Sequence, residues 1–187
     1  ITFNSDIVGT NRVCYVGLDN KRSGMTAAGL MGMLTRGTGK VLVITGFFTN
    51  SVNNLRVDGF IQELKMSYPE IELLGVEMSE VEKIVENTIE IAPDLAGIFV
   101  VSGGQAGVCK AMQNLNMETR PYVVGYDVTP TNIKALKEGT YDFLIDQEGF
   151  EQGYRPPHLL YNMIRKGEKI EKEYAYTDIS IKTKYNL

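Results

Sequence analysis

Short apolar runs alternate with longer amphipathic stretches along most of the chain. A short continuous apolar run bounded by Gly or Pro is typical of a strand that is buried on both faces of a parallel sheet. A strand followed by a helix, repeated about six times, predicts an α/β fold with a parallel sheet and right-handed crossovers. The predicted strands are 1–3, 12–17, 40–44, 71–76, 97–101, 122–124 and 143–145.

The stretches between these strands have the apolar spacing and the end signals of helices. Thr129 followed by Pro130 supplies an N-cap and a first-turn proline. In the last predicted helix, 151–166, the pair Pro156-Pro157 interrupts the middle and predicts a kink or a restart. Residues expected on the buried helix faces include Met25, Ala28, Met31, Leu34, Phe60, Leu64, Val85, Ile89, Val108, Met112, Leu136, Leu159, Leu160 and Met163.

Composition and charge exclude several classes of protein. The 187 residues are 43% hydrophobic and 22% charged, which is ordinary for a globular protein. The formal net charge of −4 argues against this segment itself binding nucleic acid through phosphates. No apolar run approaches the roughly 18 residues of a membrane span, so no membrane insertion is expected. Cys14 and Cys109 lie in apolar surroundings far apart in sequence, which predicts buried free thiols rather than a disulfide.

The motifs of common enzymes and cofactor sites are incomplete in this chain. The segment 37–40, GTGK, precedes a strand and lacks the Ser or Thr that follows the lysine of a phosphate loop. The segment 102–104, SGG, lacks the third glycine of a dinucleotide fingerprint. The single histidine, His158, has no CxxC or GxSxG motif to complete a usual zinc site or a hydrolase triad. We therefore expect no enzyme activity, no cofactor and no metal site.

Polar side chains follow the ends of several predicted strands. Amide, carboxylate and guanidinium groups suit vicinal hydroxyls, because each hydroxyl both donates and accepts a hydrogen bond. An aromatic side chain suits the C–H face of a sugar ring. The pattern predicts a site for a hydroxyl-rich small molecule; the alternative is that these groups are helix caps and loop hydrogen bonds. The candidate residues are Asn4, Phe47, Arg56, Ser102, Asp127 and Gln147.

A series of segments in this order is specific: FNSDI, YVGLDN, VLVITG, LRVDGF, GIFVVSGG, VVGYDVTP, LKEGTYDFLIDQ and EQGY. Together they resemble the effector-binding core of the lac/galactose repressor family, whose fold is shared with periplasmic sugar-binding proteins of the ribose type. The resemblance implies a type I periplasmic binding protein fold, with two lobes around a cleft and three crossovers. It implies that 1–11 end the first lobe, that 12–147 form the second, and that 148–187 return to the first lobe and the terminal tail. Most of the amino-terminal lobe is then absent.

The resemblance also implies roles for the candidate residues. Asn4 falls at a polar ligand contact just before the crossover, and Arg56 falls at an arginine that bridges sugar hydroxyls. Asp127 and Gln147 match the acidic and amide sugar contacts of the family. Ser102 falls where the family often has Asn or Asp, so its reach is shorter.

The function expected from this resemblance is that of a sugar effector-binding domain in a transcriptional regulator. Ligand-induced lobe closure would change operator binding by a population shift. We expect a cytoplasmic homodimer that binds DNA through a headpiece upstream of Ile1, since the chain opens on a strand in progress without an initiator Met. The alternative is a solute-binding protein of an ABC-type sugar importer, either periplasmic or lipid-anchored outside the cell.

Overall fold

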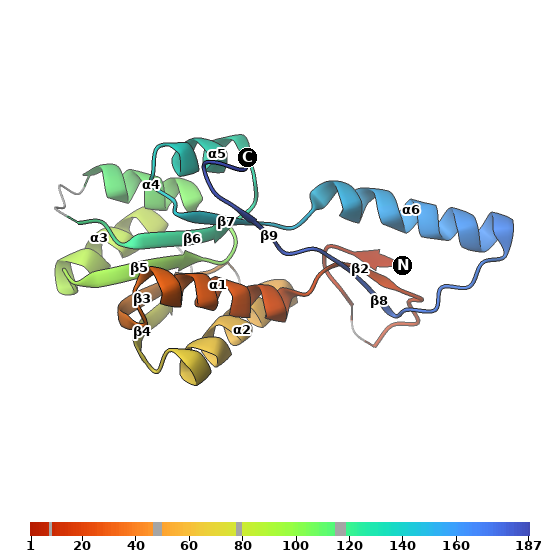
Figure 1. The fold of residues 1–187 in the computed structure, drawn as a ribbon, viewed down its shortest axis with the longest axis horizontal. Helices are drawn as coiled ribbons and strands as arrows, with labels where there is room; N and C mark the ends of the chain where they lie inside the picture. The colour runs from red at the N-terminus through yellow and green to blue at the C-terminus, as the bar shows by residue number, and fades with distance from the viewer. Residues whose placement is uncertain (8, 47–49, 78–79, 115–118) are drawn as a thin grey trace. The chain divides into compact units, whose positions relative to one another are not determined.

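Strands and helices alternate along the chain, as the apolar pattern predicts (Figure 1). The computed structural model describes residues 1–187 except 8, 47–49, 78–79 and 115–118. The strands are β1 (Thr2–Phe3), β2 (Tyr15–Leu18), β3 (Thr38–Ile44), β4 (Glu70–Glu77), β5 (Leu95–Val100), β6 (Tyr122–Tyr126), β7 (Phe143–Asp146), β8 (Tyr174–Thr177) and β9 (Ser180–Lys182). The helices are α1 (Asn20–Leu34), α2 (Ser51–Ser67), α3 (Val81–Ile91), α4 (Gln105–Asn114), α5 (Pro130–Lys137) and α6 (Gly149–Lys166).

Contacts between residues divide the chain into two units. Unit 1 consists of Ile1–Asp19 and Asp146–Ser180, and unit 2 consists of Asn20–Ile145 and Ile181–Leu187. The chain therefore passes between the units three times. These limits differ from the expected ones at residue 12, because β2 pairs with β1 and β8 and so belongs to unit 1. They also differ at the carboxyl end, where the last residues belong to unit 2.

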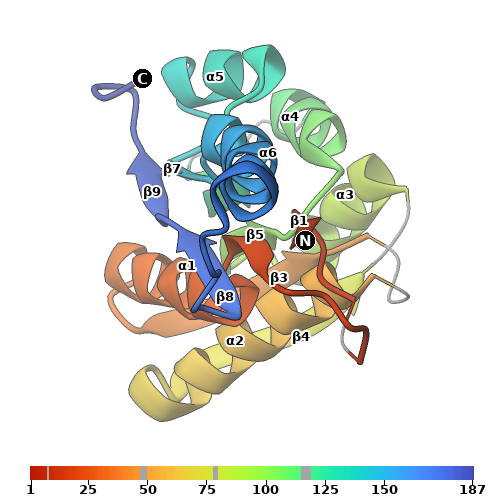
Figure 2. The same cartoon turned by 90° about the vertical axis from the view of Figure 1, so that its right-hand side faces the viewer.

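Unit 2 is built on a six-stranded sheet with the strand order β4-β3-β5-β6-β7-β9. The strands from β4 to β7 in this order run parallel to their neighbours, with pairs such as Val43↔Phe99 and Phe99↔Val124. Helices α1 and α2 cover one face of the sheet, and α3, α4 and α5 cover the other (Figure 2). The predicted α/β fold class with a parallel sheet is confirmed.

Each face of the unit 2 sheet has its own core. Beneath α1 and α2, the rings of Phe60 and Phe99 stack with centroids 4.4 Å apart, and Met31 is fully buried. On the opposite face, side chains of β3, β5, β6 and β7 pack against α3, α4 and α5. This second core contains Leu42, Ile44, Val85, Ile89, Ile98, Val100, Val108, Val123, Leu136 and Leu144. Apart from Met25, Leu34 and Met112, which are half-buried, the residues expected on the helix faces of unit 2 are buried.

Unit 1 contains the parallel sheet β1-β2-β8 and the helix α6. Helix α6 continues unbroken through Pro156 and Pro157, so the predicted restart is wrong. The ring of a proline fixes φ near the helical value, so a proline fits the helical backbone angle. Each proline lacks a backbone N–H and therefore removes one hydrogen bond from the helix. Here Arg155 Nε bonds to Glu151 Oε2 at 2.7 Å and spans the turn before the prolines.

The buried side of α6 is narrower than expected. Gln152 and Pro156 are buried, and Leu159 and Met163 are half-buried. Leu160 is exposed, so its predicted burial is wrong. Successive helical residues are about 100° apart, which turns Leu160 away from the side that contains Leu159 and Met163. Among the described residues, no helix, α6 included, has the length and apolar character needed to span a membrane.

Both cysteines are free thiols, as expected. Cys14 is buried at the start of β2, whereas Cys109 in α4 is only half-buried. Burial raises the pKa of both thiols. A raised pKa leaves less thiolate, which is the nucleophilic form of cysteine.

Candidate functional site

The carboxyl ends of β5 and β6 lie side by side in the unit 2 sheet. Val100 pairs with Gly125 near these ends. The chain continues from β5 to Ser102 and from β6 to Asp127, so two predicted site residues meet at one edge. Both line a pocket of about 360 Å³ between the β5–α4 and β6–α5 turns. Open α/β sheets bind their ligands at this kind of edge.

Asp127 has a backbone conformation that is unusual for a residue with a side chain. Its φ of 72° lies in the left-handed region, and such residues concentrate at functional sites. The buried side chain of Asn132 holds this turn, with Nδ2 3.1 Å from the Tyr126 carbonyl oxygen and 2.9 Å from the Asp127 carbonyl oxygen. Thr129 is the N-cap of α5, as predicted. Its hydroxyl accepts a hydrogen bond from the backbone N–H of Asn132 at 3.2 Å. Asp127 is therefore not the helix cap.

Arg56 is buried beneath the same edge, with 3% of its surface exposed. Its Nε donates to Asn20 Oδ1 and its Nη1 donates to the Val101 carbonyl, each at 3.0 Å. The guanidinium carbon lies 3.9 Å from the centroid of the Tyr126 ring. Val101 precedes Ser102 and Tyr126 precedes Asp127, so these contacts fix the Arg56 guanidinium next to both predicted site residues. A buried cation requires such partners, because its desolvation is costly.

Two glycines bring Arg56 to this position. A Cβ on Gly24 of α1 would lie 2.0 Å from the Arg56 carbonyl oxygen, and a Cβ on Gly59 of α2 would lie 2.0 Å from the Lys21 carbonyl oxygen. The backbones of α1 and α2 therefore approach more closely than larger residues allow. This approach is what lets Asn20 at the start of α1 bond to an arginine on α2.

Tyr126 links the arginine to the sheet. Its hydroxyl lies 2.8 Å from the Ser23 hydroxyl, and the residue is fully buried. Burial raises the pKa of Tyr126 to about 12, so the ring stays neutral at physiological pH. A neutral ring presents its π face to the guanidinium, which is a favourable arrangement.

Asn4 and Gln147, the other two described candidates, lie in unit 1. Asn4 follows β1, is exposed, and has a left-handed φ of 61°. The carbonyl of Gln147 accepts from Gln152 Nε2 at 2.6 Å and from Thr177 Oγ1, at the end of β8, at 3.2 Å. Both residues therefore lie at the edge where the parallel strands of unit 1 end. Phe47 lies outside the described residues.

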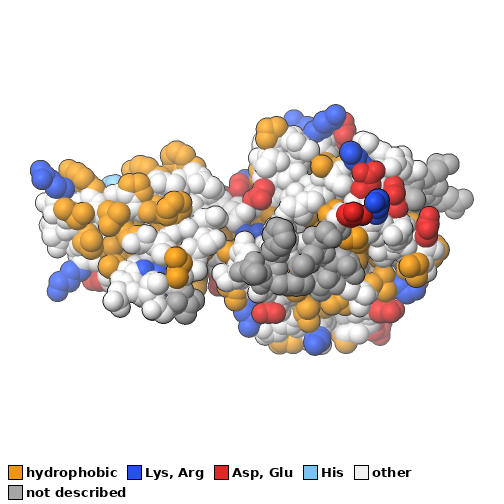
Figure 3. All heavy atoms as spheres, turned by 180° about the vertical axis from the view of Figure 1, so that it is seen from behind, with side chains coloured by type: hydrophobic (Ala, Val, Ile, Leu, Met, Phe, Trp, Pro, Cys, Tyr) orange, Lys and Arg blue, Asp and Glu red, His pale blue; other side chains and the backbone are white. Residues whose placement is uncertain are grey.

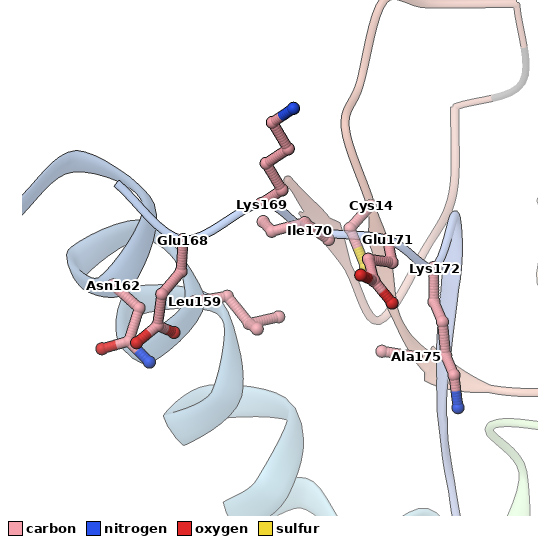
Figure 4. A pocket seen from close by; sticks show the side chains of 9 residues that line it. All are labelled: Cys14, Leu159, Asn162, Glu168, Lys169, Ile170, Glu171, Lys172 and Ala175. Carbon is pink, nitrogen blue, oxygen red and sulfur yellow. The ribbon is translucent and has the colours of Figure 1, made fainter. Parts of the chain in front are cut away.

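A second pocket, of about 270 Å³, lies within unit 1 (Figure 4). Leu159 of α6, Cys14 and Ala175 of β8 line it, together with the turn that follows α6. Figure 4 shows the ammonium groups of Lys169 and Lys172 at opposite ends of the view rather than converging on the space. Its wall combines apolar side chains with Asn162 and with charged residues of the turn after α6, such as Glu168 and Lys169. None of the described candidate site residues lines it.

Sequence analysis did not assign three residues that shape the site. Asn20, Tyr126 and Asn132 are buried and bond to a predicted site residue or to the backbone beside it. Their positions in the sequence could have indicated such roles. Tyr126 ends a strand, and Asn20 and Asn132 lie in the first turn of a helix. Within the described ranges, no group of three or more His, Cys, Asp or Glu side chains is arranged to hold a metal ion.

Comparison with known proteins identifies the family. The model of the periplasmic binding protein domain matches residues 1–169. The chain belongs to this family. The xylose/arabinose-binding protein XylF of Sulfolobus acidocaldarius is 27% identical over 113 residues, which are 57% of this chain and 28% of that protein.

Two solved structures have the same fold over the whole chain. GanP, a glucose-galactose binding protein from Geobacillus stearothermophilus, is 26% identical with a TM-score of 0.89, and the match covers 100% of this chain and 68% of that one. An ABC transporter solute-binding protein from Burkholderia graminis, in complex with D-arabinose, is 28% identical with a TM-score of 0.86, covering 100% and 67%. The chain thus spans only about two thirds or less of each of these three proteins.

Proposed function

We propose that this chain is the sugar-binding part of a solute-binding protein that serves an ABC-type sugar importer. The observation that supports it best is the meeting of Asp127, Ser102 and the fixed guanidinium of Arg56 at one edge of the unit 2 sheet. A carboxylate and hydroxyl groups recognise sugar hydroxyls by paired hydrogen bonds. We propose that Asn4 and Gln147 contribute contacts from unit 1 and that Phe47 contributes an aromatic face.

The relatives support a monosaccharide as the ligand. Their names describe proteins that bind xylose, arabinose, glucose or galactose. These sugars present vicinal hydroxyls to the groups found at the strand ends of this chain. A site made of hydrogen-bonding groups suits a protein that binds a sugar without converting it chemically.

The regulator function expected from the sequence is the alternative. It uses the same sugar site but adds a DNA-binding headpiece, a homodimer and a cytoplasmic location. The relatives are sugar-binding proteins, and these additions have no support from them. The coding sequence upstream of Ile1 separates the two functions. A basic, then apolar leader supports import, whereas a helix-turn-helix domain supports regulation.

Titration calorimetry of the full-length protein with D-xylose, D-arabinose, D-glucose and D-galactose tests the sugar site. We expect binding of at least one sugar, and a loss of about 100-fold or more in affinity in Asp127→Ala, because a charged acceptor of two hydrogen bonds is removed. The free energy of unfolding of the ligand-free variant should change by less than about 1 kcal/mol.

Asp58→Ala is the matched control, since Asp58 is an exposed carboxylate on α2 of the same unit. It should bind sugar as the unmodified protein does. Unfolding of Asp127→Ala would show that Asp127 is a structural residue instead. Unchanged affinity in a folded Asp127→Ala protein would remove Asp127 from the site.

A further inference from the structure

Gln147 lies in the short turn where the chain passes from β7 into α6. The next residue in this turn, Glu148, has a left-handed φ of 54°. A residue with a side chain keeps such a φ only where its surroundings fix it. The backbone at Gln147 therefore depends on contacts from outside the turn.

Two buried side chains donate hydrogen bonds to the backbone carbonyl of Gln147. Gln152 Nε2, near the start of α6, lies 2.6 Å from the carbonyl oxygen, and Thr177 Oγ1, at the end of β8, lies 3.2 Å from it. Each of the two donor residues is only 5% exposed. A carbonyl oxygen has two lone pairs, so the two donors together define the direction of this carbonyl.

The two donors come from elements of unit 1 that are bonded to their neighbours. Thr177 pairs with Leu18 of β2, so the end of β8 is held in the sheet. Arg155 Nη1 of α6 bonds to the Tyr176 carbonyl of β8 at 3.3 Å, which joins the helix that carries Gln152 to the strand that carries Thr177. The two donors therefore keep a fixed spacing.

The stability of α6 alone does not explain these bonds. The start of a helix leaves N–H groups without partners, whereas both bonds here satisfy a carbonyl group. The Gln152 amide is also costly, because its Oε1 is buried and has no hydrogen-bond partner among the described residues. An apolar side chain of similar shape would avoid this cost. These observations favour a role of Gln152 in the site.

We propose that Gln152 and Thr177 are positioning residues, which hold the backbone of Gln147 so that its side-chain amide meets the sugar. Both bonds go to the carbonyl oxygen, so they do not compete with the sugar for the amide. A fixed backbone lowers the entropy cost of ordering the amide when the sugar binds. The inference rests on the proposed sugar-binding function, in which Gln147 is a contact from unit 1.

Calorimetry on the full-length protein tests this role with whichever of D-xylose, D-arabinose, D-glucose and D-galactose binds most tightly. Gln147→Ala removes the contact itself and should lower the affinity about tenfold or more. Thr177→Val removes the hydroxyl at nearly constant shape and should lower it about fivefold, and Gln152→Leu should lower it about tenfold. Thr177→Ser keeps the donor and should bind within about twofold of the unmodified protein.

A double-mutant cycle separates positioning from a general structural role. In the Gln147→Ala background the amide contact is absent, so Thr177→Val and Gln152→Leu should cause no further loss of affinity. A general structural role would lower the affinity by the same factor in both backgrounds. Thr26→Val is the matched control, because the Thr26 hydroxyl bonds to the Arg22 carbonyl on α1 at 3.0 Å, and this variant should bind sugar normally.

Circular dichroism of the ligand-free variants shows which of them fold, and if only one of Thr177→Val and Gln152→Leu folds, that variant decides. The inference is wrong if a folded variant of this pair binds sugar normally, if its loss persists in the Gln147→Ala background, or if both variants unfold. It is also wrong if Gln147→Ala unfolds or binds as tightly as the unmodified protein. In all these cases the unmodified protein still binds sugar and the proposed function stands. If no sugar binds to the unmodified protein, both proposals fail.

Discussion

Unit 2 contains a buried group of aromatic rings, whereas unit 1 exposes most of its own. Phe60, Phe99 and Tyr126 of unit 2 are fully buried, and the Phe99 ring contacts each of the other two. In unit 1, Phe150 and Tyr154 stack along α6 with centroids 5.9 Å apart, yet they are 79% and 54% exposed. Figure 3 shows hydrophobic side chains grouped on this unit. The same kind of pattern along a helix thus produces a core only where the chain supplies a second layer to cover it.

The two units accordingly differ in what stabilises them. Unit 2 has a sheet with helices on both faces and two separate cores. Unit 1 has three strands and one helix, and a small sheet of this kind buries little apolar surface. We expect substitutions of comparable chemistry to cost much more in unit 2 than in unit 1.

The largest difference should appear between two phenylalanines. Phe99→Ala removes a fully buried ring that stacks on Phe60, and should lower the free energy of unfolding by about 3–5 kcal/mol. Phe150→Ala removes an exposed ring and should change it by less than about 0.5 kcal/mol. Urea denaturation followed by circular dichroism measures both. Equal losses would mean that α6 is packed as firmly as the unit 2 sheet.

Two glycines give a smaller contrast. Gly59→Ala places a methyl group against the Lys21 carbonyl where α1 and α2 meet, and should cost about 1–3 kcal/mol and weaken sugar binding through Arg56. Gly153→Ala on α6 meets nothing within 4 Å and should stabilise the helix by up to about 1 kcal/mol. Thermal denaturation compares the two variants. A neutral Gly59→Ala would contradict the close approach of α1 and α2.

The smallest contrast concerns alkaline stability. The folded pKa of Tyr126 is raised by burial to about 12 from an ordinary value of 10.0. The stability linked to the neutral phenol is fully present below pH 10 and is lost as the pH rises through 12, in total about 3 kcal/mol. Tyr126→Phe should flatten this part of the pH–stability curve, whereas Tyr154→Phe, at an exposed position, should leave it unchanged. An identical alkaline loss in Tyr126→Phe would assign the effect to other tyrosines.

The sequence predicted elements whose signals are local. The apolar runs located β3, β5, β6 and β7, and the Thr129-Pro130 signal located the start of α5. Prediction from the sequence failed where the burial or the pairing of a residue depends on residues far away in the chain. The exposure of Leu160 depends on what covers α6, and the assignment of β2 to unit 1 depends on its pairing with β8.

The site shows the same division between local and distant information. The position of Asp127 at the end of β6 was predictable because it directly follows an apolar run and precedes a capped helix, whereas its role in ligand binding stays a prediction. The roles of Asn20 and Asn132 were not, since one bonds to an arginine on another helix and the other holds two backbone carbonyls. Short side chains of this kind have many uses in loops, and only the folded backbone shows which one applies.

The pairing of β2 with β8 has a consequence for the time course of synthesis. Tyr15 lies opposite Tyr174, so a strand made early waits for a neighbour about 160 residues later in the chain. At ribosomal speeds this delay is on the order of ten to thirty seconds. During this delay, the edge of β2 that pairs with β8 has no hydrogen-bond partners. By the end of the delay, most strands of the unit 2 sheet have been made. The sheet of unit 1 is therefore completed late in translation, and a ribosome that stops before Tyr174 releases a chain that has five of the six unit 2 strands but lacks β8 of unit 1.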